Sequence, residues 1–317
     1  MRHACADFFP GNRRSASVKL LLGGIATILL AGAALLLAIR TNGPAVLDSL
    51  DRLSGGNRNV TLVAKTQYGA DPRQKLRIYA PQGKATGLPV FLFMHGGSWR
   101  WGDPDDYGFI ARAVAPHGFV VVLAGYRLGP SGRYPAMLED TADAIAEAAR
   151  IAPQYGGDPA RIVIAGHSAG AYNVVQLALE EKWLEDTGVT PRGVIGLAGP
   201  YDFYPYDKES SRDAFGSVGA GAETQPVNHI RADAPPMLLV HGEADTLVKP
   251  HNTRALARAL AAAGAPVETR LYPGFDHNTP LVALASPWRQ WRDVDDALVD
   301  FAHRVTEVSV PVQAETP

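Results

Sequence analysis

A strand–turn–helix pattern centred on one serine constrains this chain more than any other stretch. Residues 161–165 form an apolar, β-branched run that is typical of a buried strand. The pentapeptide GHSAG follows at residues 166–170, and residues 171–179 are rich in apolar helix formers. Small neighbours are needed there because larger side chains would clash across a strained turn. The pattern predicts an exposed Ser168 hydroxyl at a helix N-terminus, where developing negative charge is stabilised.

The rest of the body alternates predicted strands with predicted helices. Apolar β-branched runs predict strands, and apolar residues that recur every three or four positions predict helices. Strands are expected over residues 59–65, 76–80, 89–94, 119–124, 161–165, 193–198, 236–240 and 267–272, and helices over residues 105–115, 135–151, 171–179, 253–263 and 288–305. This order predicts an α/β fold with a mostly parallel sheet and helices on both faces. Ligands bind at the carboxyl ends of the strands in such sheets.

The charge balance and the cysteine content exclude several function classes. Of the 30 basic and 32 acidic residues, five basic and one acidic residue fall in residues 1–40, so the remainder has a net charge of −6. A mildly acidic body without basic clusters argues against nucleic acid as a partner. The only cysteine is Cys5, so the body has no cysteine nucleophile and no thiolate metal site. Its histidines lack metal-ligand spacing and it has no phosphate-binding loop, so no metal and no cofactor are expected.

Residues 20–39 form an apolar stretch of 20 residues without a charge. At about 1.5 Å per residue, a helix of this length spans roughly the 30 Å hydrocarbon core of a membrane. The stretch therefore predicts one N-terminal transmembrane anchor. Residues 40–59 contain several Gly, Asn, Asp and Ser and predict a linker to a catalytic body over residues 60–305. Residues 306–317 are expected to be a disordered tail.

Basic residues before the anchor predict its orientation. Arg13, Arg14 and Lys19 place residues 1–19 in the cytoplasm under the positive-inside rule, with the body periplasmic or extracellular. One alternative is a cleaved signal peptide, which would leave a secreted body. The apolar run is longer than a typical signal core, however, and residues 39–42 offer no small-residue cleavage site. A buried helix of the body is a further alternative.

A serine hydroxyl needs a base to accept its proton and an acid to orient that base. When the serine stands in a G-x-S-x-G turn, the acid and then the histidine follow it in the chain, at strand ends. Asp245 follows the strand 236–240, in HGEAD, and is favoured as the acid over Glu243 and Asp202. Leu247 and Val248 are expected to pack the loop that carries Asp245 back onto the body.

His277 is favoured as the base because it follows the strand 267–272, in a loop that contains Gly and Asp. His251 and His241 are the rival histidines. His241 directly ends a strand, which favours a local turn contact. Asp276 is interpreted as a solvated or capping residue, since adjacent side chains point apart.

Preorganised backbone N–H groups are required wherever an oxyanion develops. Ala169 follows the serine and supplies one candidate donor. Gly97 and Ser98, in the HGGS sequence after the strand 89–94, supply the others, because glycine lets the backbone approach a substrate oxygen. The alternative interpretation is that HGG only ends a strand. His95 is interpreted as a residue that fixes this loop by hydrogen bonding.

Taken together, these motifs resemble the α/β-hydrolase superfamily. They are most similar to carboxylesterases of the hormone-sensitive-lipase-like and feruloyl-esterase-like (BD-FAE-type) groups, and kynurenine formamidases share much of the pattern. The resemblance covers about residues 60–305 and rests on HGGSW at residues 95–99, Gly102-Asp103, Tyr126-Arg127-Leu128, Tyr134-Pro135, Asp140, GHSAG, Asp245 and His277. It implies an eight-stranded, mostly parallel sheet and the triad Ser168, Asp245 and His277. Ser98 departs from the third glycine of many lipase-like members.

The resemblance, which does not include the anchor, implies a serine esterase that hydrolyses small-molecule esters through an acyl-enzyme. The anchor adds that this esterase is tethered to a membrane. An amide-cleaving relative, either a formamidase or a peptidase, has the same triad and stays open as an alternative. A catalytically silent hydrolase-fold binding module is a second alternative. Trp99 and Tyr201 are candidates to bind substrate, and Tyr204, Tyr206 and Phe215 are further candidates to line the cleft. No sequence feature indicates an oligomeric state.

Overall fold

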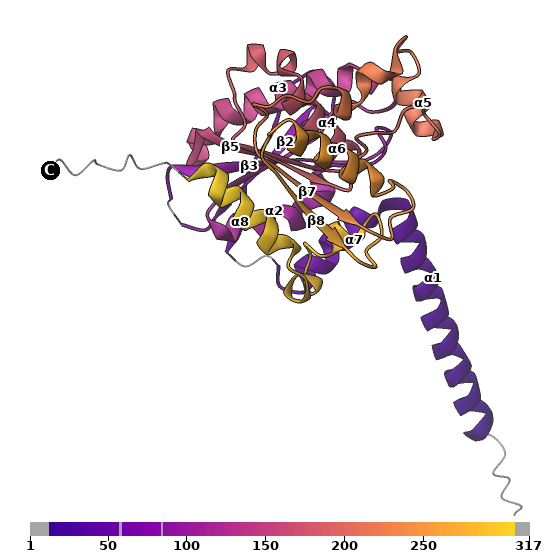
Figure 1. Cartoon of the computed structure of the whole chain (residues 1–317). Helices are drawn as coiled ribbons and strands as arrows, with labels where there is room; N and C mark the ends of the chain where they lie inside the picture. The colour runs from indigo at the N-terminus through magenta and orange to yellow at the C-terminus, as the bar shows by residue number, and fades with distance from the viewer. Residues whose placement is uncertain (1–12, 57–58, 84, 308–317) are drawn as a thin grey trace, which may run out of the picture. The chain divides into compact units, whose positions relative to one another are not determined.

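The computed structural model describes residues 13–56, 59–83 and 85–307. The chain divides into two compact units, Met1–Val46 and Leu47–Pro317. The second unit is built on one eight-stranded sheet (Figure 1). Its strands are β1 (Val60–Gln67), β2 (Lys75–Pro81), β3 (Leu88–Met94), β4 (Val120–Ala124), β5 (Gly157–His167), β6 (Gly193–Leu197), β7 (Met237–Gly242) and β8 (Val267–Tyr272).

The strand order is β1-β2-β4-β3-β5-β6-β7-β8. The pairs β1–β2 and β2–β4 are antiparallel, and all the other pairs are parallel. The expected eight-stranded, mostly parallel sheet is therefore confirmed. Because β3, β5, β6, β7 and β8 all run the same way, their carboxyl ends meet at one edge of the sheet.

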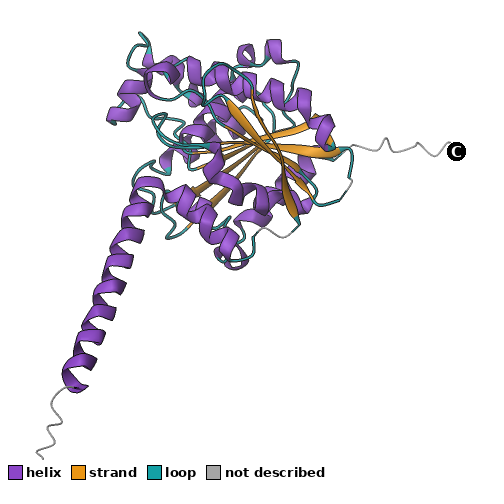
Figure 2. Ribbon diagram, turned by 180° about the vertical axis from the view of Figure 1, so that it is seen from behind, coloured by secondary structure: helices purple, strands orange, loops and turns teal. Residues whose placement is uncertain are grey.

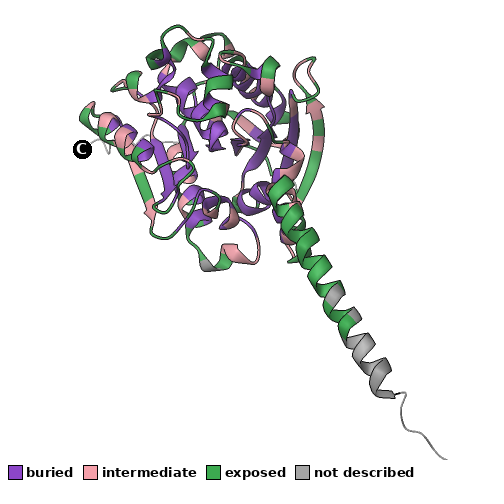
Figure 3. Ribbon diagram, turned by 90° about the vertical axis from the view of Figure 1, so that its right-hand side faces the viewer, coloured by how far each residue is buried: buried purple, intermediate pink, exposed green. Residues whose placement is uncertain are grey.

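Helices cover both faces of this sheet (Figure 2). The helices are α1 (Arg13–Leu53), α2 (Gly108–Val114), α3 (Ala136–Ile151), α4 (Ala169–Leu179), α5 (Glu209–Phe215), α6 (His251–Ala262), α7 (Thr279–Val282) and α8 (Val294–Thr306). Helices α3, α4 and α6 share one apolar core with the strands, and α2, α7 and α8 share the other. The central strands are buried on both faces (Figure 3), as their unbroken apolar runs predict.

Two predicted helices are divided in the structure. The single helix expected over residues 288–305 consists of a 3-10 turn, Trp288–Trp291, and α8. Arg292 between them is extended (φ −141°, ψ 140°), and its guanidinium lies 4.6 Å from the ring centre of Phe275. The helix expected over residues 105–115 likewise begins with a 3-10 turn, Pro104–Tyr107, before α2. Short turns that tertiary contacts stabilise leave little trace in apolar periodicity.

The N-terminal helix α1 extends beyond the predicted anchor. One helix in the described part of the chain, over Thr27–Leu53, is long and apolar enough to cross a membrane or to be a signal sequence. Asn42 breaks the helical geometry (φ −151°, ψ 75°) two residues before Pro44, and its Oδ1 accepts from the Ala45 N–H over 3.2 Å, as the N-cap of the second helical segment. The first twelve residues of the expected cytoplasmic tail and residues 308–317 of the expected C-terminal tail lie outside the described residues.

The segment expected to be a linker differs from that expectation. Residues 43–53 are helical, and the chain joins the second unit at Leu47. Asp51 is fully buried, and it accepts hydrogen bonds from Arg112 Nε (2.5 Å), Arg289 Nη2 (3.0 Å) and the Ser286 N–H (2.8 Å). Asp48 also pairs with Arg112, at 2.5 Å. These buried ion pairs make residues 47–53 part of the body.

Candidate active site

Ser168 lies between β5 and α4 in a strained backbone conformation (φ 53°, ψ −118°). Its N–H donates to the carbonyl of Leu197 over 2.8 Å, which joins the turn to β6. A Cβ atom at Gly166 would lie 2.4 Å from the carbonyl carbon of Gly170, and one at Gly170 would lie 2.2 Å from the carbonyl oxygen of Met94. Only glycine fits at either position, so the two glycines allow the sharp turn at Ser168.

The structure brings Ser168, His277 and Asp245 together from three loops. His277 Nε2 lies 2.9 Å from Ser168 Oγ, and His277 Nδ1 lies 2.7 Å from Asp245 Oδ2. All three side chains are buried, and Ser168 is 7% exposed at the cavity described below. An arrangement of hydroxyl, imidazole and carboxylate in this order can move a proton off the hydroxyl and stabilise the imidazolium that forms.

Four donors surround the carboxylate of Asp245. Its Oδ1 accepts from the N–H groups of Leu247 (2.8 Å) and Val248 (2.9 Å), although the Leu247 side chain is 51% exposed and does not pack the loop onto the body as expected. Its Oδ2 accepts from His277 and is also 3.2 Å from His241 Nε2. Burial by itself would raise the pKa of Asp245, but the hydrogen bonds from His241 and His277 hold it well below its usual range.

The rival acids, Glu243 and Asp202, and the rival base His251 make other contacts in the described part of the chain. Glu243 is exposed and pairs with Arg254, and His251 Nε2 lies 3.0 Å from the main-chain oxygen of Asp202. Asp202 lines the cavity, without a contact to His277 in the described part of the chain. Asp276 caps the turn before α7, where its Oδ1 accepts from Thr279.

Two buried histidines make contacts that the sequence does not specify. His241 makes the expected local contact, at the carbonyl oxygen of Val248, and in addition reaches Asp245. His167, inside the GHSAG turn, lies with its Nε2 3.0 Å from the main-chain oxygen of His277. Burial lowers the pKa of His167 to about 3, so its ring stays neutral next to His277. His241 stands four residues before Asp245 in HGEAD, which is the one sequence signal for its contact.

The candidate oxyanion residues differ in their positions. Ser98 and Ala169 line the same cavity as Ser168. Gly97 is not among the residues that line it and instead shapes the loop. Its φ is 117°, and a Cβ atom there would lie 2.0 Å from the carbonyl oxygen of Trp101. Ser98 and Trp99 also have positive φ (55° and 59°), a conformation that costs energy outside glycine.

The loop residue His95 is not among the residues that line the cavity at Ser168. It is buried, its Nδ1 lies 2.7 Å from the Gly96 carbonyl oxygen, and its own carbonyl accepts from the Tyr126 hydroxyl over 3.0 Å. Burial lowers the pKa of His95 to about 4, which keeps the ring neutral.

A cavity of about 250 Å³ opens at Ser168. Trp99 lines it, and its Nε1–H donates to Asn173 over 3.1 Å while its ring stacks on Phe203. The other lining residues come from two segments, Pro200 to Ser211 and Leu247 to Asn252. The exposed side of the cavity includes Tyr204, 51% exposed.

Tyr201 does not line this cavity, so its expected role in substrate binding is wrong. The side chain is fully buried. Its hydroxyl occupies the space above two glycines, because a Cβ atom would lie 2.0 Å from it at Gly196 and 2.4 Å at Gly199. The ring therefore turns inward. Phe215 is likewise buried, with its ring centre 4.9 Å from that of Trp99, and supports the cavity wall from behind.

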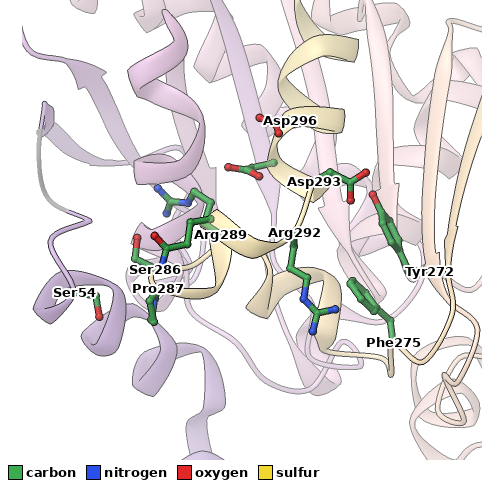
Figure 4. A pocket seen from close by; sticks show the side chains of 11 residues that line it. Ser54, Tyr272, Phe275, Ser286, Pro287, Arg289, Arg292, Asp293 and Asp296 are labelled. Atoms are coloured by element: carbon green, nitrogen blue, oxygen red, sulfur yellow. The ribbon is translucent and has the colours of Figure 1, made fainter.

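A second cavity, of about 780 Å³, shares no lining residue with the first (Figure 4). It lies among β8, the 3-10 turn before α8 and the start of α8. Arg292 and Phe275 lie side by side on one wall, and Asp293 faces Tyr272. None of Ser168, His277 and Asp245 reaches this cavity. The described residues contain no group of three His, Cys, Asp or Glu side chains that could hold a metal ion.

Comparisons with known proteins agree with this fold. The BD-FAE family model matches residues 76–260, more than half of the chain. The isoprenylcysteine alpha-carbonyl methylesterase of Arabidopsis thaliana is 28% identical over 261 residues, which cover 74% of this chain and 61% of that protein. The acetyl esterase of Salmonella paratyphi B is 29% identical over 266 residues, which cover 76% of this chain and 78% of that protein. The chain thus spans about three fifths of the plant methylesterase.

Solved structures give the same fold. Esterase B of Lactobacillus rhamnosis superposes with a TM-score of 0.68 at 19% identity, covering 92% of this chain and 96% of that one. A thermostable esterase from Pseudomonas putida superposes with a TM-score of 0.67 at 23% identity, covering 85% and 91%. At these low identities, the solved structures show only that the fold is shared. The evidence for a family relationship is the match to the BD-FAE family model. The chain therefore belongs to the BD-FAE family.

Proposed function

We propose that this chain hydrolyses carboxylic esters through an acyl-enzyme on Ser168. The observation that carries the proposal is the unbroken series of hydrogen bonds from Asp245 through His277 to Ser168, with distances of 2.7 and 2.9 Å. Each group has the chemical character that its place requires: an ionised acid, an imidazole and a hydroxyl in a strained turn.

In the proposed mechanism, Ser168 Oγ attacks the ester carbonyl while His277 Nε2 takes its proton. Asp245 holds the Nδ1–H tautomer of His277 and stabilises its charged form. The N–H groups of Ala169 and Ser98, which line the cavity, donate to the oxyanion of the tetrahedral intermediate, and Gly97 shapes the loop that carries Ser98. His277 then protonates the leaving alcohol, and water activated by the same histidine hydrolyses the acyl-enzyme. No cofactor is required for these steps.

The substrate is proposed to be a small-molecule ester with a short acyl group. The cavity of about 250 Å³ is smaller than common ligand pockets of roughly 300–1,000 Å³. Trp99 and Phe203 give it an aromatic wall. The acetyl esterase of Salmonella paratyphi B is named for a short acyl group of this kind.

The body is further proposed to be tethered to a membrane by α1. Support comes from the 20 uncharged residues at positions 20–39 and from the basic residues Arg13, Arg14 and Lys19 before them. The proposed topology places residues 1–19 in the cytoplasm and the body in the periplasm or outside the cell. Secretion after cleavage of a signal peptide is the alternative.

The test of the proposed activity is a panel of esters of increasing acyl length, each matched with the corresponding amide. Purified full-length protein should hydrolyse the short esters fastest, and Ser168→Ala should lose nearly all of the catalysed rate. Ser131→Ala is a matched control, because Ser131 is exposed and bonds only to the carbonyl of Leu128. Preference for amides would indicate an amide-cleaving relative. Failure of a fluorophosphonate to label the wild-type protein would indicate a silent binding module.

A further inference from the structure

His241, the penultimate residue of β7, is a second histidine in contact with Asp245. Its side chain is fully buried, and both ring nitrogens have partners. Nε2 lies 2.7 Å from the carbonyl oxygen of Val248 and 3.2 Å from Asp245 Oδ2. Nδ1 lies 2.8 Å from Oγ1 of Thr253, a buried residue of α6. The ring therefore joins the end of β7 to the loop that carries Asp245 and to α6.

The partners determine where the ring carries a proton. A carbonyl oxygen and an ionised carboxylate oxygen can only accept hydrogen bonds. Nε2 of His241 faces one of each, so it must bear a hydrogen and donate it. The Thr253 hydroxyl, on the other side, can donate or accept and suits either state of Nδ1. Turning the ring over would point Nε2–H away from Asp245 and break both contacts.

The contact matters because of the atom it reaches. Oδ2 of Asp245 is the same oxygen that accepts from His277 Nδ1. Oδ1 is held by two main-chain N–H groups, those of Leu247 and Val248. Without His241, the one donor to Oδ2 among the described residues would be His277 itself, so no group independent of the base would fix the position of that oxygen. The N–H of His241, shared between Oδ2 and the carbonyl oxygen of Val248, supplies such a group.

We propose that His241 is a positioning residue that aligns Asp245 Oδ2 with His277 and thereby orients the base. This inference rests on the proposed function of Ser168, His277 and Asp245. His241 is not among the residues that line the cavity at Ser168, so it acts on the base and not on bound substrate. Loss of its hydrogen bond should lower kcat and leave KM nearly unchanged.

Two amide substitutions form a matched pair for the test. In His241→Gln, the amide nitrogen takes nearly the position of Nε2 and keeps a donor towards Asp245. In His241→Asn, the amide ends near the position of Nδ1 and falls short of Asp245. Both variants place an uncharged amide in the same buried site. We expect His241→Asn to lower kcat about tenfold or more, as for loss of a charge-assisted hydrogen bond, and His241→Gln to stay within about threefold of wild type.

Equal losses in the two variants would mean that His241 only fills space, and a wild-type kcat in His241→Asn would overturn the proposal directly. A large rise in KM would also contradict it. Ser168→Ala in the same assay separates this question from the proposed function. An inactive Ser168→Ala beside a fully active His241→Asn rejects the role of His241 alone, and an active Ser168→Ala rejects the proposed function itself.

Thr253→Val gives a second route if His241→Asn does not fold. Valine keeps the shape of threonine and removes the hydroxyl that faces Nδ1, which leaves the ring of His241 less firmly held. We expect kcat to fall about threefold or more with KM unchanged. A wild-type kcat in a folded Thr253→Val would count against the proposal.

Discussion

Nε2 of His167 lies 3.0 Å from the main-chain oxygen of His277, although the two residues are 110 positions apart in the chain. His167 directly precedes Ser168, so the turn that carries the serine also holds the backbone of the histidine that faces it. The donor must be His167, because a carbonyl oxygen only accepts. The ring centres of the two histidines are 4.9 Å apart, which makes a neutral His167 important for a charged His277.

The buried histidines predict a loss of stability in acid. Burial lowers the pKa of His167 from 6.5 to about 3 and that of His95 from 6.5 to about 4. As the pH falls from about 6.5 towards 3, these histidines become protonated in the unfolded chain but stay neutral in the folded chain. Protonation therefore stabilises the unfolded state, and the free energy of unfolding decreases across that range. At about pH 4.5 the loss should be about 2 kcal/mol for each histidine, relative to neutral pH.

Urea unfolding at neutral pH and at about pH 4.5 measures this loss. His167→Gln keeps a donor for His277 but cannot titrate, so its acid loss should be smaller than that of wild type by about 2 kcal/mol. His117→Gln is the control, because His117 is exposed. If the free energy of unfolding depends on pH in the same way in wild type and His167→Gln, the pKa of His167 is not lowered in the folded state.

Asp245→Asn should lower kcat by about a thousandfold or more with little change in KM. The amide would favour the wrong tautomer of His277 and would not stabilise its positive charge. Glu243→Gln is the matched control, since Glu243 is exposed and pairs only with Arg254. Its kcat should stay within about twofold of wild type. If the two variants lose activity equally, Asp245 is not the acid of this site.

Gly97→Ala should distort the loop that carries Ser98. A Cβ atom at Gly97 would lie 2.0 Å from the carbonyl oxygen of Trp101, a contact that backbone movement alone can relieve. We expect kcat to fall about a hundredfold, as when an oxyanion donor is removed. Gly118→Ala separates this clash from backbone strain, because Gly118 also has positive φ but open space around it. That variant should lose about 1 kcal/mol of stability and keep its activity.

Asp51→Ala should destabilise the body by about 3 kcal/mol, because it leaves Arg112 buried without one of its two carboxylates and Arg289 without its own. Arg52→Ala is the comparison, since Arg52 is half exposed and pairs with Asp48 at 2.8 Å. That change should cost less than about 1 kcal/mol. Chemical unfolding of the two full-length variants measures the difference. Similar costs would mean that residues 47–53 are not needed to stabilise the body.

Cys5 offers a test of the proposed topology, because it is the only cysteine of the chain and lies in the segment expected to be cytoplasmic. A maleimide that cannot cross membranes should label Cys5 after cells are permeabilised and leave it unlabelled in intact cells. Labelling in intact cells would reverse the proposed orientation. Mature protein that lacks Cys5 altogether would indicate cleavage of a signal peptide.

Local sequence was sufficient for the architecture. Unbroken apolar runs predicted β3, β4 and β7 as buried strands, because a strand covered on both faces has no polar side. The GHSAG turn was predictable because the steric need for Gly166 and Gly170 arises within a few residues of Ser168. Asp245 and His277 each follow a predicted parallel strand, so the sequence placed both residues at the same edge of the sheet. Their catalytic roles stay predictions.

The order of the strands and helices, and the reactive residues at one edge of the sheet, could be predicted from residue patterns along the chain. The contacts between buried side chains could not: His241 with Asp245, His167 with His277, and Asp51 with Arg112 are seen only in the folded structure. It also turned Tyr201 inward over Gly196. Periodicity reports whether a position is buried, but a buried polar group finds its partner through packing between distant segments. That pairing leaves no regular spacing along the chain.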